Sequence, residues 1–154
     1  MVVLRSFVAD DMDDVVSLFR GTIHTVNAKD YTQEQLDAWA PENINKDRWS
    51  ARLLSHFTVV AEAEGVICGF GDLHDNGYFD HLFVHKDFQG QRVGSLIVEE
   101  IERYAKGNGL LQLEVHVSIT AKTFFLSKGY FVVSEQQVEY NGQTFTNFQM
   151  KKIL

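Results

Sequence analysis

The chain has 154 residues, of which 45% are hydrophobic and 23% are charged, and its formal net charge is −7. These values are typical of one globular domain, here residues 1–154, that buries a core. The negative charge excludes a dedicated nucleic-acid binder, which needs a basic face. The sequence has neither an apolar stretch long enough to span a membrane nor the apolar region of a signal peptide. Its one cysteine, Cys68, cannot form a disulfide within the chain and favours a cytoplasmic location.

The first third of the chain predicts one strand and three helices. Val2 to Val8 is a β-branched run typical of a strand, and an amphipathic helix follows to about Asn27. We interpret four acidic residues as helix-start and solvated residues rather than metal ligands: Asp10, Asp11, Asp13 and Asp14. Two more helices are predicted, one from Thr32 to Pro41 and one from Asn45 or Lys46 to about His56.

The middle of the chain predicts three consecutive strands. They are Phe57–Ala63, Val66–Leu73 and Tyr78–Val84, separated by turns at Glu64-Gly65 and Asp75 to Gly77. An amphipathic helix follows, because apolar residues recur there at helical spacing: Leu96, Ile97, Ile101 and Tyr104.

The last third predicts a strand, a short helix and a closing hairpin. In the strand Leu110–Val117, apolar residues alternate with Gln112, Glu114 and His116 on the other face; the apolar set is Leu111, Leu113, Val115 and Val117. The short helix is capped at or near Thr120 and ends at Gly129. Asn141-Gly142 is a strong turn signal between two long strands, Tyr130–Tyr140 and Gln143–Ile153.

This order of elements predicts a mixed α/β sheet flanked by helices, in the sequence β-ααα-βββ-α-β-α-ββ. The strands Tyr78–Val84 and Leu111–Val117 are joined by a helix, so we expect them to be parallel neighbours.

The loop before the amphipathic helix is predicted to bind an anion. A strand, a tight loop and a helix N-terminus leave unpaired amides near the positive end of the helix dipole. Gly90 and Gly94 let the backbone approach a ligand closely. The predicted pyrophosphate cradle is Gln89, Gly90, Gln91, Arg92, Val93, Gly94 and Ser95. Neither the Walker pattern nor the dinucleotide-binding glycine pattern is present.

Two segments resemble motifs of the GNAT acetyltransferases. Gln89 and Gly94 match the acetyl-CoA motif Q/R-x-x-G-x-G/A, with Arg92 at the usual middle glycine. The segment from Ser118 to Tyr130 is similar to the downstream motif N/S-x-x-A-x-x-F-Y-x-K-x-G-F/Y, with Phe125 at the usual tyrosine and Ser127 at the usual lysine. The C-terminal run most resembles the YafP-like branch of this family.

The resemblance implies a fold, a cosubstrate and a set of binding residues. It implies that the two parallel strands splay apart and that the pantetheine arm of acetyl-CoA lies between them. The backbone of Leu82, Phe83 and Val84 would bind that arm, and Ser118 and Phe125 would border it. The early helices would cover the acceptor end, with four candidate wall residues: His24, Tyr31, Trp39 and Trp49. Core packing is the alternative role for the tryptophans.

Acetyl transfer to an amine requires a base for the amine and an acid for the departing thiolate. Asp80 is the candidate base because it shares a strand face with Tyr78, Leu82 and Val84. A structural or acceptor-orienting carboxylate is the alternative role, and Glu114 and His116 are reserve candidates. Phe125 cannot act as the acid, so water or another hydroxyl must protonate the thiolate.

Other reactive residues point to no separate chemistry. His74, His81, His85 and His116 do not form a metal-ligand spacing, so no metal site is predicted. Cys68 lies in an apolar strand and is interpreted as a buried thiol, which favours direct attack in a ternary complex. Two functions remain open: an N-acetyltransferase acting on a primary amine, and a catalytically weak acyl-CoA-binding or sensor module. A small-molecule amine, a protein amine and a homodimer also remain open.

Overall fold

A computed structural model describes all residues, 1–154, and shows one seven-stranded mixed sheet with helices on both faces. The strands lie in the order β1-β2-β3-β4-β5-β7-β6. They are β1 Val2–Ser6, β2 Phe57–Ala63, β3 Val66–Leu73, β4 Tyr78–Val84, β5 Gln112–Ser118, β6 Phe131–Tyr140 and β7 Gln143–Ile153. The helices are α1 Met12–Thr25, α2 Gln33–Trp39, α3 Lys46–Ser55, α4 Val93–Gly107 and α5 Lys122–Ser127. This confirms the predicted fold class and element order.

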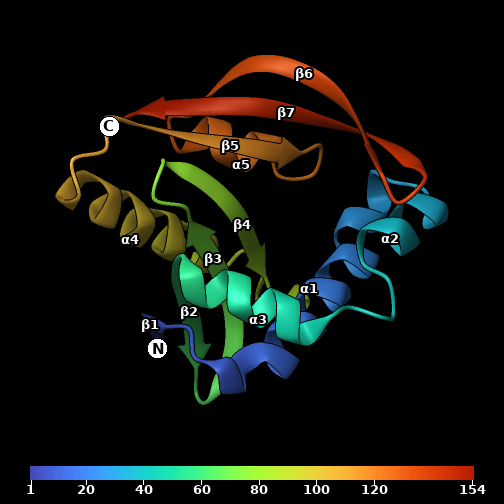
Figure 1. Ribbon diagram of the computed structural model, residues 1–154, viewed down its shortest axis with the longest axis horizontal. Coiled ribbons are helices and arrows are strands. Elements are labelled where there is room, and N and C mark those ends of the chain that lie inside the picture. The colour runs from blue at the N-terminus through green and yellow to red at the C-terminus, as the bar shows by residue number, and fades with distance from the viewer.

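Side chains that alternate along β2 divide the core into two layers. Val59 and Ala61 pack in the cluster that contains α4 and β5, whereas Val60 packs with α1 and the helices after it. Figure 1 shows the result: α1 and α3 lie against the β1–β4 part of the sheet, and the β6–β7 hairpin forms the far side with β5 and α5.

The sheet opens between its fourth and fifth strands. β4 and β5 are parallel, as expected, but only Tyr78 with Glu114 and Phe79 with Val115 are in register. Beyond Phe79 the two strands diverge, which Figure 1 shows as the separation of β4 from the β5–β7–β6 arm. The predicted splay is therefore present, and it leaves one edge of β4 without a strand partner.

Local signals in the sequence set several element boundaries correctly. Thr32 accepts a hydrogen bond from the Gln35 amide while the Gln35 side chain accepts from the Thr32 amide, which is a capping box. Asn45 caps α3 through the Arg48 amide. Asn141 and Gly142 both have positive φ, 48° and 81°, as a tight hairpin turn requires.

Two local expectations were wrong. Asp11 is not solvated: it is 6% exposed and accepts two hydrogen bonds of 2.8 Å from the Arg5 guanidinium. Leu111 precedes β5 and is 81% exposed, so it does not share the apolar face of that strand. The N-cap residue of α5 is Ala121, next to Thr120 as expected, and the Thr120 hydroxyl donates to Asp30. None of the helices is long and apolar enough to cross a membrane.

Candidate active site

A cavity of about 630 Å³ lies where the sheet opens between β4 and β5. The cavity is lined by residues of α1 to α3, β4, the start of α4, β5, α5 and the β6–β7 hairpin. Eight of the predicted site residues line it: Asp80, Leu82, Phe83, Val84, Gln89, Gly94, Ser118 and Phe125. The other predicted cofactor residues, Gly90, Gln91, Arg92, Val93 and Ser95, belong to the adjacent loop and helix start.

The backbone of β4 has a definite orientation along this cavity. The His85 amide donates to the Cys68 carbonyl across the antiparallel pair of β3 and β4. Bonded pairs recur at every second residue in such a ladder, so Phe83 directs its amide and carbonyl toward β3. Leu82 and Val84 consequently direct theirs toward the open edge. Phe83 therefore differs from its two neighbours: its backbone groups face β3, and its side chain lines the cavity.

Part of this open edge is already occupied. The Val84 carbonyl accepts hydrogen bonds of 2.8 Å from the Thr22 hydroxyl and from the Gln89 side-chain amide. The first of these bonds ties β4 to α1, and the second fixes the loop that leads to α4. The amide of Val84 and both backbone groups of Leu82 are what this edge presents to a ligand.

The start of α4 presents unpaired amides next to this edge. No side chain caps the helix, so its first amides have no partner within the helix. Gly90 and Arg92 both have positive φ, 72° and 67°, which turns the loop sharply into the helix. The Arg92 side chain is exposed and lies 3.6 Å from Glu99. A methyl group added at Gly94 would lie 3.2 Å from the Phe124 ring. The Phe124 ring therefore restricts substitution at Gly94 even when no ligand is bound.

At the other end of the cavity, a bulge in β4 places Asp80. Leu73 pairs with Phe79 and Asp72 with His81, which leaves Asp80 without a partner on β3. The bulge interrupts the alternation of side chains, and both Asp80 and His81 line the cavity. The Asp80 carboxylate is 2.8 Å from His74 Nε2 and 3.7 Å from His81 Nδ1. The sequence predicted the position of Asp80 at the cavity but not its imidazole neighbours.

Asp72 lies beside Asp80, at the centre of the hydrogen bonds that join β3, β4 and His56. It is fully buried on β3 and contacts His56 Nδ1 at 2.9 Å and His81 Nδ1 at 2.8 Å. Burial alone would raise the pKa of Asp72, but hydrogen bonds from the two histidines outweigh it and lower that pKa. Burial would lower the pKa of His81, but Asp72 outweighs it and raises that pKa. An ion pair between Asp72 and His81 therefore anchors β4 to β3 beside Asp80.

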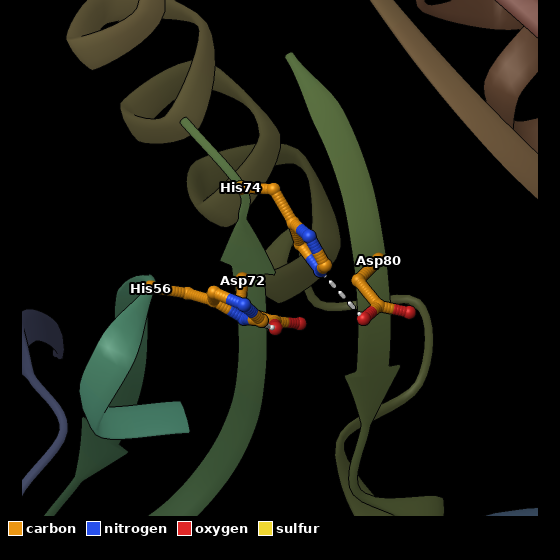
Figure 2. A group of neighbouring side chains, drawn as sticks. All are labelled: His56, Asp72, His74 and Asp80. Carbon is orange, nitrogen blue, oxygen red and sulfur yellow. Dashed lines mark hydrogen bonds and ion pairs between the residues drawn. The ribbon is translucent and has the colours of Figure 1, made fainter. Parts of the chain in front are cut away.

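Figure 2 shows how four of these side chains converge from separate elements. His56 follows α3, Asp72 lies on β3, His74 follows β3, and Asp80 lies on β4. The rings of His56 and His74 are stacked with centroids 3.7 Å apart. Sequence reasoning missed this cluster because its members lie on different segments. A carboxylate within the otherwise apolar strand Val66–Leu73 was the one available signal.

The comparisons with known proteins agree with this geometry. The model of the acetyltransferase (GNAT) domain family matches residues 27–152. The chain belongs to the GNAT acetyltransferase family. It is 29% identical over 148 residues to the uncharacterized N-acetyltransferase YafP of Escherichia coli (strain K12), covering 96% of this chain and 93% of that one. This match agrees with the resemblance to the YafP-like branch.

Solved GNAT structures share the whole fold. A GCN5-related N-acetyltransferase from Rhodopseudomonas palustris is 33% identical, with a TM-score of 0.95 over 99% of this chain and 95% of that chain. YncA from Salmonella typhimurium, whose structure contains its cofactor acetyl-CoA, has a TM-score of 0.75 at 16% identity, over 100% of this chain and 94% of that chain. At that identity the second likeness concerns the fold alone.

The position where the GNAT motif usually has tyrosine is apolar and buried here. Phe125 is 3% exposed and packs edge-on against Phe79, Phe124 and Tyr130. The Ser118 hydroxyl accepts from the Ala121 amide and has no acceptor for its own hydrogen. Tyr78 also lines the cavity, and burial raises the pKa of its phenol to about 12. Ser118 and Tyr78 are therefore two hydroxyls at the cavity that could donate a proton.

Only some of the reserve bases and predicted acceptor-wall residues line the cavity. His116 lines the cavity, whereas the Glu114 carboxylate is held by Gln149 Nε2 at 3.0 Å and lies 3.3 Å from His116. Three predicted wall residues line the cavity: Tyr31, Trp39 and Trp49. The fourth, His24, instead contacts the Ala40 carbonyl at 2.8 Å and does not reach it. Cys68 is fully buried, and burial raises the pKa of its thiol.

Proposed function

We propose that residues 1–154 act as one N-acetyltransferase domain, which transfers the acetyl group of acetyl-CoA to a primary amine by direct attack in a ternary complex. One observation carries the proposal: a single cavity joins the open edge of β4, the uncapped start of α4 and the Asp80 carboxylate. The first two features suit a cofactor arm with a pyrophosphate, and the third suits an amine.

The cofactor would bind mainly to backbone groups. The pyrophosphate would accept hydrogen bonds from amides between Gln89 and Ser95, where the helix dipole favours negative charge. The pantetheine arm would then run along the open edge of β4, bonding to Leu82 and to the Val84 amide. Phe83 would contribute its side chain to the cavity wall. Ser118 and Phe125 would border the thioester end from the side of β5 and α5.

The transfer itself needs two proton movements. The amine gives up a proton to Asp80, directly or through water, and its nitrogen attacks the thioester carbon. The carbon–sulfur bond breaks, an amide forms, and the thiolate takes a proton from water or from a cavity hydroxyl such as Ser118. His74, which is 2.8 Å from Asp80, holds the carboxylate in place. No group in the cavity is an activated nucleophile of the kind a covalent acetyl-enzyme requires.

The test is transfer of acetyl groups from acetyl-CoA to a panel of small and peptide amines, measured as released thiol. Thiol release that depends on the amine, with acetylated amine identified by mass spectrometry, is the expected result. An acetyl group trapped on the protein at a kinetically competent rate would contradict direct attack. Cys68→Ser should retain activity.

The buried phenyl ring of Phe125 favours a second candidate function, an acyl-CoA-binding or sensor module. The usual phenol is replaced by an apolar group there, which removes the general acid. The two candidates differ in the same assay: a binding module would show CoA affinity by calorimetry and no amine-dependent thiol release. The cytoplasmic location stays a prediction, with which the buried free thiol of Cys68 is compatible.

A further inference from the structure

The strongest unexplained feature of the molecule is the cluster of His56, Asp72, His74 and Asp80. Each residue offers one ligand atom, a ring nitrogen or a carboxylate oxygen, and these four atoms all lie within 4.8 Å of one another. Figure 2 shows the four side chains converging from β3, β4 and the residues just after α3 and β3. Ligand atoms of a tetrahedral zinc site stand about 3.3 Å apart, given bonds of about 2.0–2.1 Å to nitrogen and oxygen. Small side-chain movements would therefore close the set around an ion.

The partners of the carboxylates in the cluster also suit a cation, because His81, which forms the ion pair with Asp72, lies outside the four candidate ligands. Two carboxylates lie together, and all their ion-pair partners within 4.0 Å are histidines, with no lysine or arginine among them. The stacked rings of His56 and His74 disfavour two positive charges side by side, because their centroids are 3.7 Å apart. Neutral imidazole is the form of histidine that binds a metal.

The surroundings also support a metal site. His81 Nδ1 and the His81 amide both hold Asp72 Oδ1, at 2.8 and 2.9 Å, which leaves Oδ2 directed to His56. Such outer contacts orient ligands in metal sites. Asp72 is fully buried, whereas the His74 and Asp80 side chains keep 31% and 19% exposure, which provides a path for an ion to enter.

We infer that His56, Asp72, His74 and Asp80 form a binding site for a divalent transition-metal ion, with Zn²⁺ the best match to two imidazoles and two carboxylates. The ring hydrogens that now bridge His56 to Asp72 and His74 to Asp80 would move to the other nitrogen of each ring, so that each neutral imidazole offers a lone pair to the ion. The ion would also coordinate the Asp80 carboxylate, which lowers its basicity and so inhibits the proposed acetyl transfer. This inhibition rests on the proposed function, whereas metal binding does not.

The test is calorimetric titration of the chelator-treated, tag-free chain with ZnCl₂, followed by Co²⁺ absorption spectroscopy to report ligand geometry. We expect one ion per chain and the visible absorption of four-coordinate Co²⁺. His74→Ala and Asp80→Asn should each weaken Zn²⁺ binding by more than the roughly 10–100-fold that loss of an outer contact costs. His81→Ala, which removes only such a contact, should fall within that range.

The matched control is His85→Ala, which removes a histidine outside the cluster and should leave Zn²⁺ affinity unchanged. Circular dichroism shows which variants are folded, and the partly exposed positions of His74 and Asp80 make them safer choices than Asp72. Equal Zn²⁺ affinity in the wild-type chain and in folded His74→Ala and Asp80→Asn would overturn the inference. Zn²⁺ that binds the wild type but leaves turnover unchanged would instead contradict the role of Asp80 in transfer.

Discussion

The two ends of the cavity offer different kinds of chemical group to a ligand. At the α4 end, the groups offered are backbone amides and carbonyls, namely the edge of β4 and the first turn of the helix. At the Asp80 end, the groups offered are side chains from β3, β4 and the residues that follow α3 and β3, which meet in a partly buried network. Backbone recognition tolerates many side chains provided that the loop keeps its conformation, whereas side-chain recognition fails when one member is lost.

The largest expected effect comes from the side-chain end. Asp80→Asn keeps the shape of the residue but removes the proton acceptor, so kcat should fall by roughly 10²–10⁴-fold. The Kd for CoA, measured by calorimetry, should stay within error of the wild type, because the proposed cofactor contacts are backbone groups of Leu82, Val84 and the start of α4, not the Asp80 side chain. A wild-type kcat on a good acceptor would shift the role of base to Glu114 or His116.

The next largest effect is expected at the α4 end of the cavity, at Gly94. In Gly94→Val, the added carbons would meet the Phe124 ring at 3.2 Å and the Val84 side chain at 3.5 Å, narrowing the helix start. Relief of these contacts should displace the helix start and weaken CoA binding by about 1–2 kcal/mol, which raises the Kd for CoA about tenfold.

The matched control is Gly107→Ala in the last turn of α4, where an added Cβ meets nothing within 4 Å. Its CoA affinity should be unchanged. An unchanged Kd in a folded Gly94→Val variant would mean that the pyrophosphate binds elsewhere.

A smaller effect is expected where the two ends meet. Phe125→Tyr restores a phenol at the position that is apolar in this chain. If departure of the thiolate limits the rate, kcat should rise a few-fold, well below the full range of general acid catalysis. CoA affinity should not change. The measurement is kcat under saturating acetyl-CoA, and a lower kcat would show that the phenol disturbs the aromatic packing around Phe125.

The smallest kinetic effect is expected outside the cavity, where Arg5 holds Asp11. The side-chain hydrogen bond from Arg5 lowers the pKa of Asp11. The pair therefore stabilises the fold above the unfolded pKa of about 3.9, and this contribution is lost as pH falls through the lower folded pKa.

Asp11→Asn should reduce the free energy of unfolding at pH 7 by about 1–3 kcal/mol and leave both kcat and CoA affinity unchanged. Thermal melts of the two proteins should converge as the pH is lowered below 4. A constant difference in melting temperature from pH 7 to pH 3 would show that the charge of Asp11 is not what stabilises the wild type.

Local patterns in the sequence were enough to predict the fold and the loop proposed to hold the cofactor. These signals are the alternation from Gln112 to Val117, the capping residue Thr32, the turn at Asn141 and Gly142, and the loop before α4. Each depends on neighbours a few residues apart, which a linear reading can see. The parallel pairing of β4 with β5 followed from the order of the elements, whereas the opening between them followed only from the resemblance to the GNAT acetyltransferases.

The arrangement at the Asp80 end of the cavity follows from contacts between separate strands and helices. The partnership of Asp72 with His56 and His81 depends on the register of β3 with β4 and on where α3 ends, and the presence of both Asp80 and His81 at the cavity depends on a one-residue bulge. A bulge shifts which side chains face a ligand without leaving a pattern in the sequence. His56 contacts Asp72 from 16 residues away, and Asp72 contacts His81 from 9 residues away across the β3–β4 pair, so these contacts exist only once α3 and the sheet have come together.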